Sequence, residues 1–135
     1  MSIFLCPIQK RWMTYVGWVL TGLIAMMMLV SAGMRLSENP KMVDQFTDKL
    51  DLAATLLVPL GAVELLSTLL FLATPTTVLG AILLTGYLGG AVATHLRAGD
   101  SLIVPLSISV LIWLALFLRE PRLRALLPWR CPPRT

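Results

Sequence analysis

The chain has 135 residues, of which 57% are hydrophobic and only 13% are charged. An ordinary soluble domain is roughly a quarter charged, so a water-soluble fold of this size could not bury so much apolar surface, and part of that surface must face lipid. Basic residues outnumber acidic ones by 11 to 7, but they are not interleaved with aromatic residues on a polar face. We therefore interpret them as a membrane-topology signal and expect no nucleic-acid binding.

Four apolar segments are predicted to cross the membrane as helices, because each is close to the length of about twenty residues that a bilayer requires. These segments are residues 12–34, 52–73, 77–96 and 102–118. The first follows Lys10 and Arg11, but its apolar run is too long for the core of a signal peptide, which has roughly 7–15 residues. No segment alternates polar and apolar residues as a barrel strand does. We therefore expect an all-α fold, an integral membrane four-helix bundle.

The distribution of charge predicts how these helices are oriented. Basic residues gather in the two terminal tails, at Lys10, Arg11, Arg119, Arg122, Arg124, Arg130 and Arg134. The positive-inside rule then places both termini in the cytoplasm of a multi-pass protein of the cell membrane. The chain divides into an N-terminal tail of residues 1–11, a transmembrane domain of residues 12–120 with an outer loop at 35–51, and a basic tail of residues 121–135.

The outer loop carries a helix signal of its own. Asn39 and Pro40 suit the start of a helix, and Met42, Phe46 and Leu50 recur at every fourth position, so that they share one face. We expect a short amphipathic helix that either lies at the outer membrane interface or extends the second span. A solvated loop with scattered apolar residues is the alternative.

Glu64 is the acidic residue within the predicted spans. A charged side chain at mid-span costs at least about 2.5–3.5 kcal/mol on insertion scales, so such residues usually face the bundle interior and serve a function. Gly61 and Thr68 share its helix face, and Pro59 is expected to loosen the helix beside it. The alternative is a protonated glutamate that only bonds a neighbouring hydroxyl.

The helical rise predicts which polar groups lie at the level of Glu64. Counting residues from the cytoplasmic ends reaches Thr21 on the first helix, Thr85 to Tyr87 on the third and Ser109 on the fourth. Hydroxyl groups are therefore the predicted neighbours of the carboxyl group.

Other polar residues are expected nearer the outer surface. Arg35, His95 and Asp100 lie at the outer ends of their helices, about 18 Å from the level of Glu64. We interpret them, with Lys49, as the mouth of a cavity whose floor is Glu64. The alternative for His95 is a polar anchor that bonds Asp100 or a loop carbonyl.

Small residues in the third helix form the stripe Gly86-x-x-x-Gly90. Such a stripe permits close contact between helices, and we expect it to serve packing within the bundle. A homodimer interface is the alternative.

The sequence offers no metal site, because His95 has no second histidine and no cysteine at ligand spacing. Cys6 and Cys131 lie in opposite tails and form no C-x-x-C pair, which argues against a thiol–disulfide enzyme. The sequence identifies no cofactor.

Two stretches carry a resemblance, namely Gly61-x-x-Glu64 in the second predicted helix and Ala91-x-x-Thr94-His95-Leu96-x-x-Gly99-Asp100 at the end of the third. They are similar to the DoxX-like family over residues 12–120, although this chain reads "KLDLAA" where the family often has Gly-Tyr-Pro. The resemblance implies a compact four-helix membrane bundle. DoxX itself resembles the small subunit of a thiosulfate:quinone oxidoreductase, and other relatives are linked to membrane redox or oxidative-stress complexes.

The function predicted from this resemblance and from the residues is that of an accessory subunit or binder of a quinone or other lipid-like molecule. It would act in a membrane redox or stress-response system, with the lipid bilayer, the apolar small molecule and a redox protein as partners. The alternative is a stand-alone membrane enzyme, an isomerase or hydrolase of an apolar substrate, with Glu64 as general acid or base. The predicted ligand-binding residues are Glu64, Gly61, Thr68, Tyr87, His95, Arg35 and Asp100.

Overall fold

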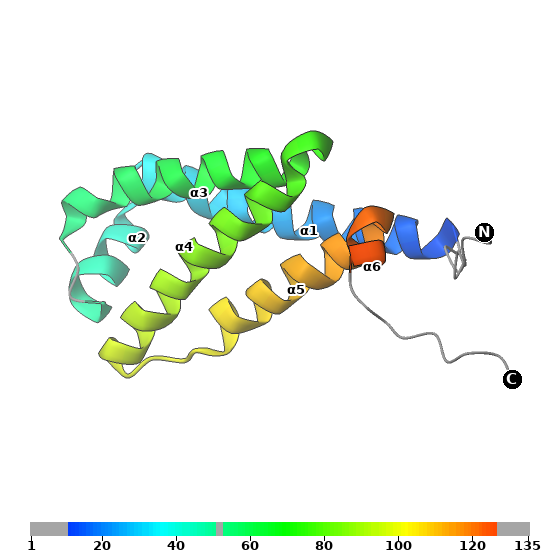
Figure 1. The fold of residues 1–135 in the computed structure, drawn as a ribbon. Helices are drawn as coiled ribbons and strands as arrows, with labels where there is room; N and C mark the ends of the chain where they lie inside the picture. The colour runs from blue at the N-terminus through cyan, green and yellow to red at the C-terminus, as the bar shows by residue number, and fades with distance from the viewer. Residues whose placement is uncertain (1–10, 51–52, 127–135) are drawn as a thin grey trace, which may run out of the picture.

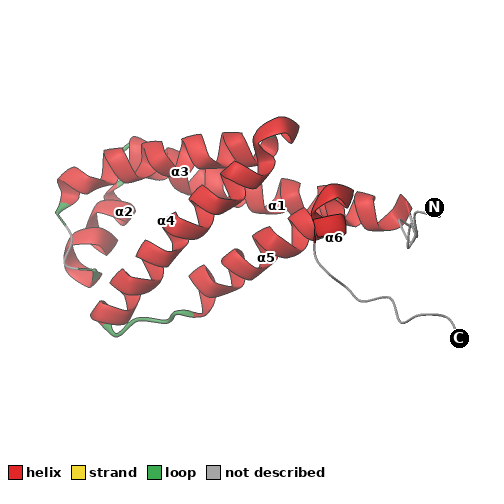
Figure 2. Cartoon of the chain, viewed as in Figure 1, coloured by secondary structure: helices red, strands yellow, loops and turns green. Residues whose placement is uncertain are grey.

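The computed structural model describes residues 11–50 and 53–126, and every regular element in these ranges is helical (Figure 2). The longer helices are α1 (Arg11–Leu36), α3 (Leu57–Leu72), α4 (Thr77–Ala98) and α5 (Ile103–Arg119). The shorter elements are α2 (Pro40–Asp44), a π-helical turn (Gln45–Lys49), 3-10 turns at Ala54–Leu56 and Thr74–Thr76, and α6 (Pro121–Leu126). The all-α prediction is confirmed for the described residues. The predictions for Cys6 and Cys131 concern residues outside these ranges.

Three helical segments are long and apolar enough to cross a membrane. They are Arg11–Leu36, Ala54–Leu72 and Thr74–Ala98, and α5 is a shorter apolar helix. Their outward faces carry large exposed apolar side chains, among them Met26, Leu66, Ile82 and Val110. A lipid environment explains this surface, because contact between so much apolar surface and water is unfavourable.

The longer helices form a splayed bundle. α1 packs against α3 and α5, and α4 packs against the same two helices. In Figure 1, α4 and α5 meet α3 and α1 near the end that carries α6, and they diverge from them toward the end that carries α2. We call the first the closed end and the second the open end.

Two glycines permit the close contacts at the closed end. A Cβ atom added to Gly80 would lie 2.1 Å from the backbone nitrogen of Phe71, so α4 and the end of α3 touch backbone to backbone. A Cβ atom added to Gly17 would lie 2.7 Å from the backbone nitrogen of Arg119, which brings α1 and α5 together in the same way. Neither position has room for a larger residue without a shift of the backbone.

Arg119 is buried at the closed end, with a relative exposure of 5%. Its Nη2 group donates to the carbonyl oxygen of Phe71 at 3.0 Å and also to the hydroxyl of Thr77. Its guanidinium carbon lies 4.4 Å from the ring centroid of Trp18, in cation–π contact. Arg119, which the sequence analysis grouped with the basic C-terminal tail, is the last residue of α5 and ties that helix to α1, α3 and α4.

The predicted packing role of Gly86 and Gly90 was wrong within the described part of the chain. A Cβ atom added to either residue would meet no heavy atom within 4 Å. Because α4 has already diverged from α3 at this level, the stripe lines open space, and the close contact is made by Gly80 nearer the start of the helix.

The connection between α1 and α3 folds back against the open end. Asn39 caps α2 through its side-chain oxygen, which accepts the Lys41 backbone N–H at 3.2 Å. The buried side chains of Phe46 and Leu50 then pack with Leu57, at the start of α3. The apolar face that the sequence predicted is therefore turned toward the protein.

The start of α3 lies further along the chain than the predicted span. The helix begins at Leu57, after the 3-10 turn Ala54–Leu56, whereas the predicted span begins at residue 52. Pro59 consequently falls in the first turn of α3, where its missing N–H removes little. Any loosening of the helix by Pro59, which the sequence predicted beside Glu64, is therefore limited to the start of α3.

Candidate functional site

A cavity of about 810 Å³ occupies the open end of the bundle. Residues of α1, α2, α3, α4 and α5 contribute to its wall. Most of the wall is apolar and includes Met28, Phe46, Leu60, Leu88 and Ile108. Gly86 and Gly90 also line it, so the small residues of α4 widen the cavity.

Glu64 is the polar centre of this wall and is 1% exposed. One carboxylate oxygen, Oε2, accepts a hydrogen bond from Nη1 of Arg35 and forms an ion pair with it. The same oxygen accepts a hydrogen bond from the Tyr87 hydroxyl at 3.0 Å. All three residues line the cavity, and they come from α1, α3 and α4. We call them the polar triad.

The prediction that Arg35 lies far from Glu64, at the mouth of the cavity, was wrong. Because α3 begins at Leu57, Glu64 is only about 10 Å along the helix from its first residue. Side chains also tilt toward the N-terminus of their own helix, and α1 and α3 run in opposite directions. The Arg35 side chain therefore reaches into the bundle from one end while the Glu64 side chain leans toward it.

Aromatic rings fix the position of the Arg35 guanidinium. Its central carbon lies 5.5 Å from the ring centroid of Phe46 and 5.6 Å from that of Tyr87. The guanidinium is therefore held by one carboxylate and two rings, and its side chain remains 17% exposed toward the cavity. Its Nε atom is buried without a hydrogen-bond partner among the described residues.

Gly61 and Thr68 lie next to Glu64 but do not line the cavity. A Cβ atom added to Gly61 would lie 3.1 Å from the Cβ of Arg35, so this glycine lets α1 and α3 approach where the ion pair forms. The Thr68 hydroxyl is buried and donates to the backbone carbonyl of Glu64 at 2.7 Å. The structure thus places both beside the polar triad, although neither lines the cavity.

His95 and Asp100 line the cavity at the end of α4. His95 Nδ1 lies 3.1 Å from Asp100 Oδ2, and Asp100 Oδ1 accepts the Ser101 backbone N–H at 2.8 Å. The hydrogen bond from the Ser101 backbone, followed by that from His95, lowers the pKa of the Asp100 carboxyl. The anchoring of His95 by Asp100, left open by the sequence, is therefore present.

The geometry of this helix end explains the spacing of its motif. Gly99 adopts a left-handed conformation with φ of 68°, and its N–H bonds the carbonyl of Leu96. The Asp100 N–H bonds the carbonyl of His95 at 2.9 Å. This is a Schellman cap, in which glycine at the left-handed position lets the chain turn sharply. The turn brings the Asp100 carboxylate back to the His95 ring.

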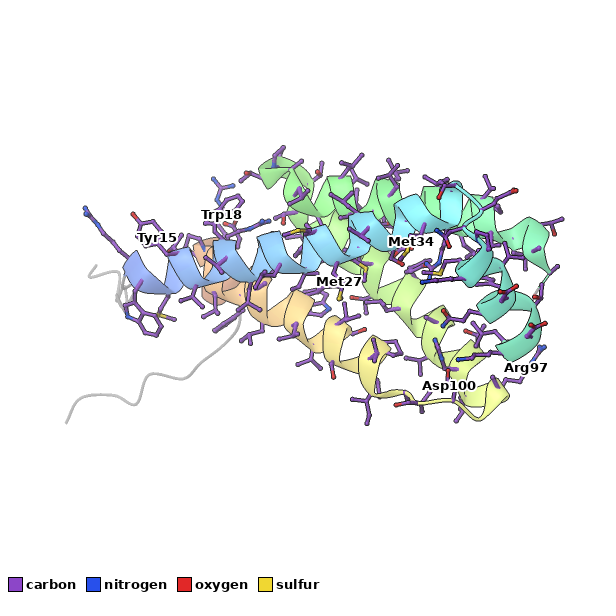
Figure 3. The ribbon with its side chains drawn as sticks, turned by 180° about the vertical axis from the view of Figure 1, so that it is seen from behind. Tyr15, Trp18, Met27, Met34, Arg97 and Asp100 are labelled. Carbon is purple, nitrogen blue, oxygen red and sulfur yellow. The ribbon has the colours of Figure 1, made fainter. Side chains whose placement is uncertain are left out.

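Met27 and Ser31 on α1 also line the cavity, and the sequence did not single them out. Met27 lies between the ribbons of α1 and α5 in Figure 3.

Within the described residues, no group of three or more histidine, cysteine, aspartate or glutamate side chains could hold a metal ion.

Comparison with known proteins identifies the family of the chain. The family model described as the DoxX-like family matches residues 19–118. No curated protein and no solved structure matches the chain. The matched region contains the polar triad, the cavity and the capped end of α4. The chain therefore belongs to the DoxX-like family and is a small membrane protein.

Proposed function

We propose that this protein binds a quinone or another lipid-like molecule in the cavity at the open end, and that it serves as an accessory subunit of a membrane redox or stress-response system. The observation that carries the proposal is an apolar cavity of about 810 Å³ with the polar triad in its wall. Ligand sites commonly have volumes of about 300–1,000 Å³, mostly apolar walls and a few convergent polar groups.

The polar triad suits a ligand whose head carries an acceptor oxygen. A guanidinium has five N–H donors, and the structure records one hydrogen bond for that of Arg35, to Glu64, among the described residues. Arg35 would donate to a carbonyl oxygen of the ligand, and the Glu64 carboxylate would accept from a hydroxyl group. Both the oxidised and the reduced forms of a quinone head therefore have a complementary group.

The membrane arrangement that supports this function has α1, α3, α4 and α5 as spans, with both termini in the cytoplasm of a multi-pass cell-membrane protein. The closed end then faces the cytoplasm, and the cavity opens toward the outer half of the bilayer. α5 has 17 residues, a length of about 25 Å, which is slightly short for a span. Because the helices converge at Arg119, the cytoplasmic end of the short helix α5 would lie inside the bundle.

The second candidate is an isomerase or hydrolase of an apolar substrate with Glu64 as general acid or base. The Tyr87 hydroxyl, 3.0 Å from the carboxylate, supplies a second proton-transfer group at hydrogen-bond reach. Substrate conversion by the purified protein, lost in the Glu64→Gln variant, would favour this candidate over binding alone.

The binding proposal is tested by filling the cavity without touching the polar triad. Gly90→Leu places a side chain into the cavity from α4, whereas Gly89→Leu adds the same side chain one residue away, at a position that does not line the cavity. We expect decylubiquinone to raise the melting temperature of the wild type and of Gly89→Leu, because a ligand that binds the folded state stabilises it. Gly90→Leu should bind at least about tenfold more weakly, a loss of about 1.4 kcal/mol. Equal responses in all three proteins would contradict the proposal.

A further inference from the structure

A second apolar depression lies on α1, outside the cavity. It has a volume of about 410 Å³ and is lined by Leu23, Met26, Met27, Val30, Ser31 and Met34. These positions recur at helical spacing and form one face of α1, about 16 Å long from Leu23 to Met34. Leu23, Met26 and Val30 are each more than half exposed, so the face is turned toward lipid. We call it the methionine groove.

The methionine groove and the cavity share two residues. Met27 and Ser31 line both, so a single layer of side chains separates the inside of the bundle from its lipid-facing surface. Ser31 is small, and methionine is unbranched and changes conformation readily.

The divergence of α1 and α5 also leaves the bundle less closely packed at the open end. α1 and α5 are held together at the closed end by the contact of Gly17 with Arg119, and they diverge toward the open end (Figure 3). On α5, Val104 and Ile108 also line the cavity. Apolar residues of both helices therefore line the cavity where the two helices diverge.

We propose that the ligand is a long-chain amphiphile whose head lies at the polar triad and whose hydrocarbon tail leaves the cavity between α1 and α5 to lie in the methionine groove. This inference rests on the proposed binding function and specifies its ligand class. The polar triad satisfies the head, the shared residues Met27 and Ser31 mark the exit, and the groove offers the tail an apolar path that continues into the bilayer. The ligand would then enter from the membrane and not from the aqueous phase.

Photolabelling tests the path of the tail. The probe is decylubiquinone with a diazirine at the end of its chain, applied to the purified protein in lipid nanodiscs, with labelled peptides located by mass spectrometry. We expect labelling of α1 between Leu23 and Met34 and a large loss of that labelling when the tail-less quinone ring competes for the polar triad. A phosphatidylcholine with the same diazirine chain, which reports bulk lipid, should label the groove without being displaced by the ring.

Val30→Trp should fill the methionine groove without altering the cavity, since Val30 lines the groove alone, and Val19→Trp is the matched control, since Val19 is 63% exposed and lines neither the cavity nor the groove. We expect groove labelling by the quinone probe to fall at least fivefold in Val30→Trp and to persist in Val19→Trp. Thermal stabilisation by the tail-less ring should persist in both variants, which shows that each is folded and has an intact head site.

Three outcomes would overturn the inference. Labelling confined to residues inside the cavity would show that the tail stays within the bundle, and groove labelling that the ring fails to displace would show ordinary lipid contact. In both cases stabilisation by the ring would leave the binding proposal standing. Absence of stabilisation by either quinone would remove the binding proposal together with the inference.

Discussion

The two ends of the bundle each hold an arginine, and they hold it in different ways. Arg119 at the closed end is bound by the carbonyl of Phe71, the hydroxyl of Thr77 and the ring of Trp18, all of them neutral. Arg35 at the open end is bound by the carboxylate of Glu64.

The surroundings of the two arginines also differ, because one end of the bundle is closely packed and the other contains a cavity. Around Arg119, glycines allow backbones to touch and the space is filled by packing. Around Arg35, the helices have separated and a cavity of about 810 Å³ lies against the ion pair. Burial of an arginine is therefore no functional signal by itself. The residue at the packed end joins helices, whereas the residue at the open end lines a cavity.

The largest effect is expected from breaking the ion pair at the open end. Arg35→Met leaves the Glu64 carboxylate buried without its cation, and removing one partner of a buried pair typically costs about 3–5 kcal/mol. The double variant Arg35→Met with Glu64→Leu removes both charges and should recover most of that stability without recovering quinone binding. Melting temperatures and decylubiquinone binding would be measured in detergent, with Lys41→Met as an exposed basic control. A double variant that binds the quinone as tightly as the wild type would show that the polar triad is not needed for ligand recognition.

The next largest effect is expected at the closed end. Gly80→Ala places a methyl group 2.1 Å from the Phe71 backbone nitrogen, and overpacking of this kind costs about 3 kcal/mol, the upper part of its usual range. Gly86→Ala adds the same methyl group on the same helix, where nothing lies within 4 Å, and should leave the melting temperature nearly unchanged. If the two variants were equally stable, the distinction between a packed end and an open end would not hold.

The smallest effect concerns the rim of the cavity at low pH. Hydrogen bonds from the Ser101 backbone and His95 lower the pKa of Asp100 in the folded protein below its ordinary value of 3.8. A carboxyl whose pKa is lowered by folding contributes stability above its unfolded pKa and loses that contribution as the pH falls through the folded value. The wild type should therefore lose slightly more stability than Asp100→Asn when the pH is lowered from about 5 to below 3.8. Parallel pH profiles for the two proteins would show that this pair contributes nothing.

Helix formation was predictable because hydrocarbon forces a spanning backbone to bond within itself. The first span, predicted at residues 12–34, corresponds to α1 at Arg11–Leu36. Glu64 could be singled out for the same reason, since an acidic residue in an apolar run is costly wherever it is placed.

Other features depend on contacts between distant parts of the chain. The partner of Glu64 followed from the late start of α3 and from the opposite tilt of side chains on antiparallel helices, which a count of residues along each helix does not capture. Spacing also could not show which glycines of α4 meet another helix, because this depends on the face and the level of the helix at which the neighbour lies, and Gly80 meets Phe71 whereas Gly86 meets nothing within 4 Å. The burial of Arg119 could not be predicted, because it depends on Phe71 and Trp18, which are far away in sequence.

The most direct test of the central claim is native mass spectrometry of the protein extracted from its own membrane. We predict that the wild type and Gly89→Leu retain a bound lipid-like molecule of one defined mass, and that Gly90→Leu, whose new side chain enters the cavity, loses it. Retention of the same molecule by Gly90→Leu, or its absence from a folded wild-type protein, would contradict a ligand site beside Glu64, Arg35 and Tyr87.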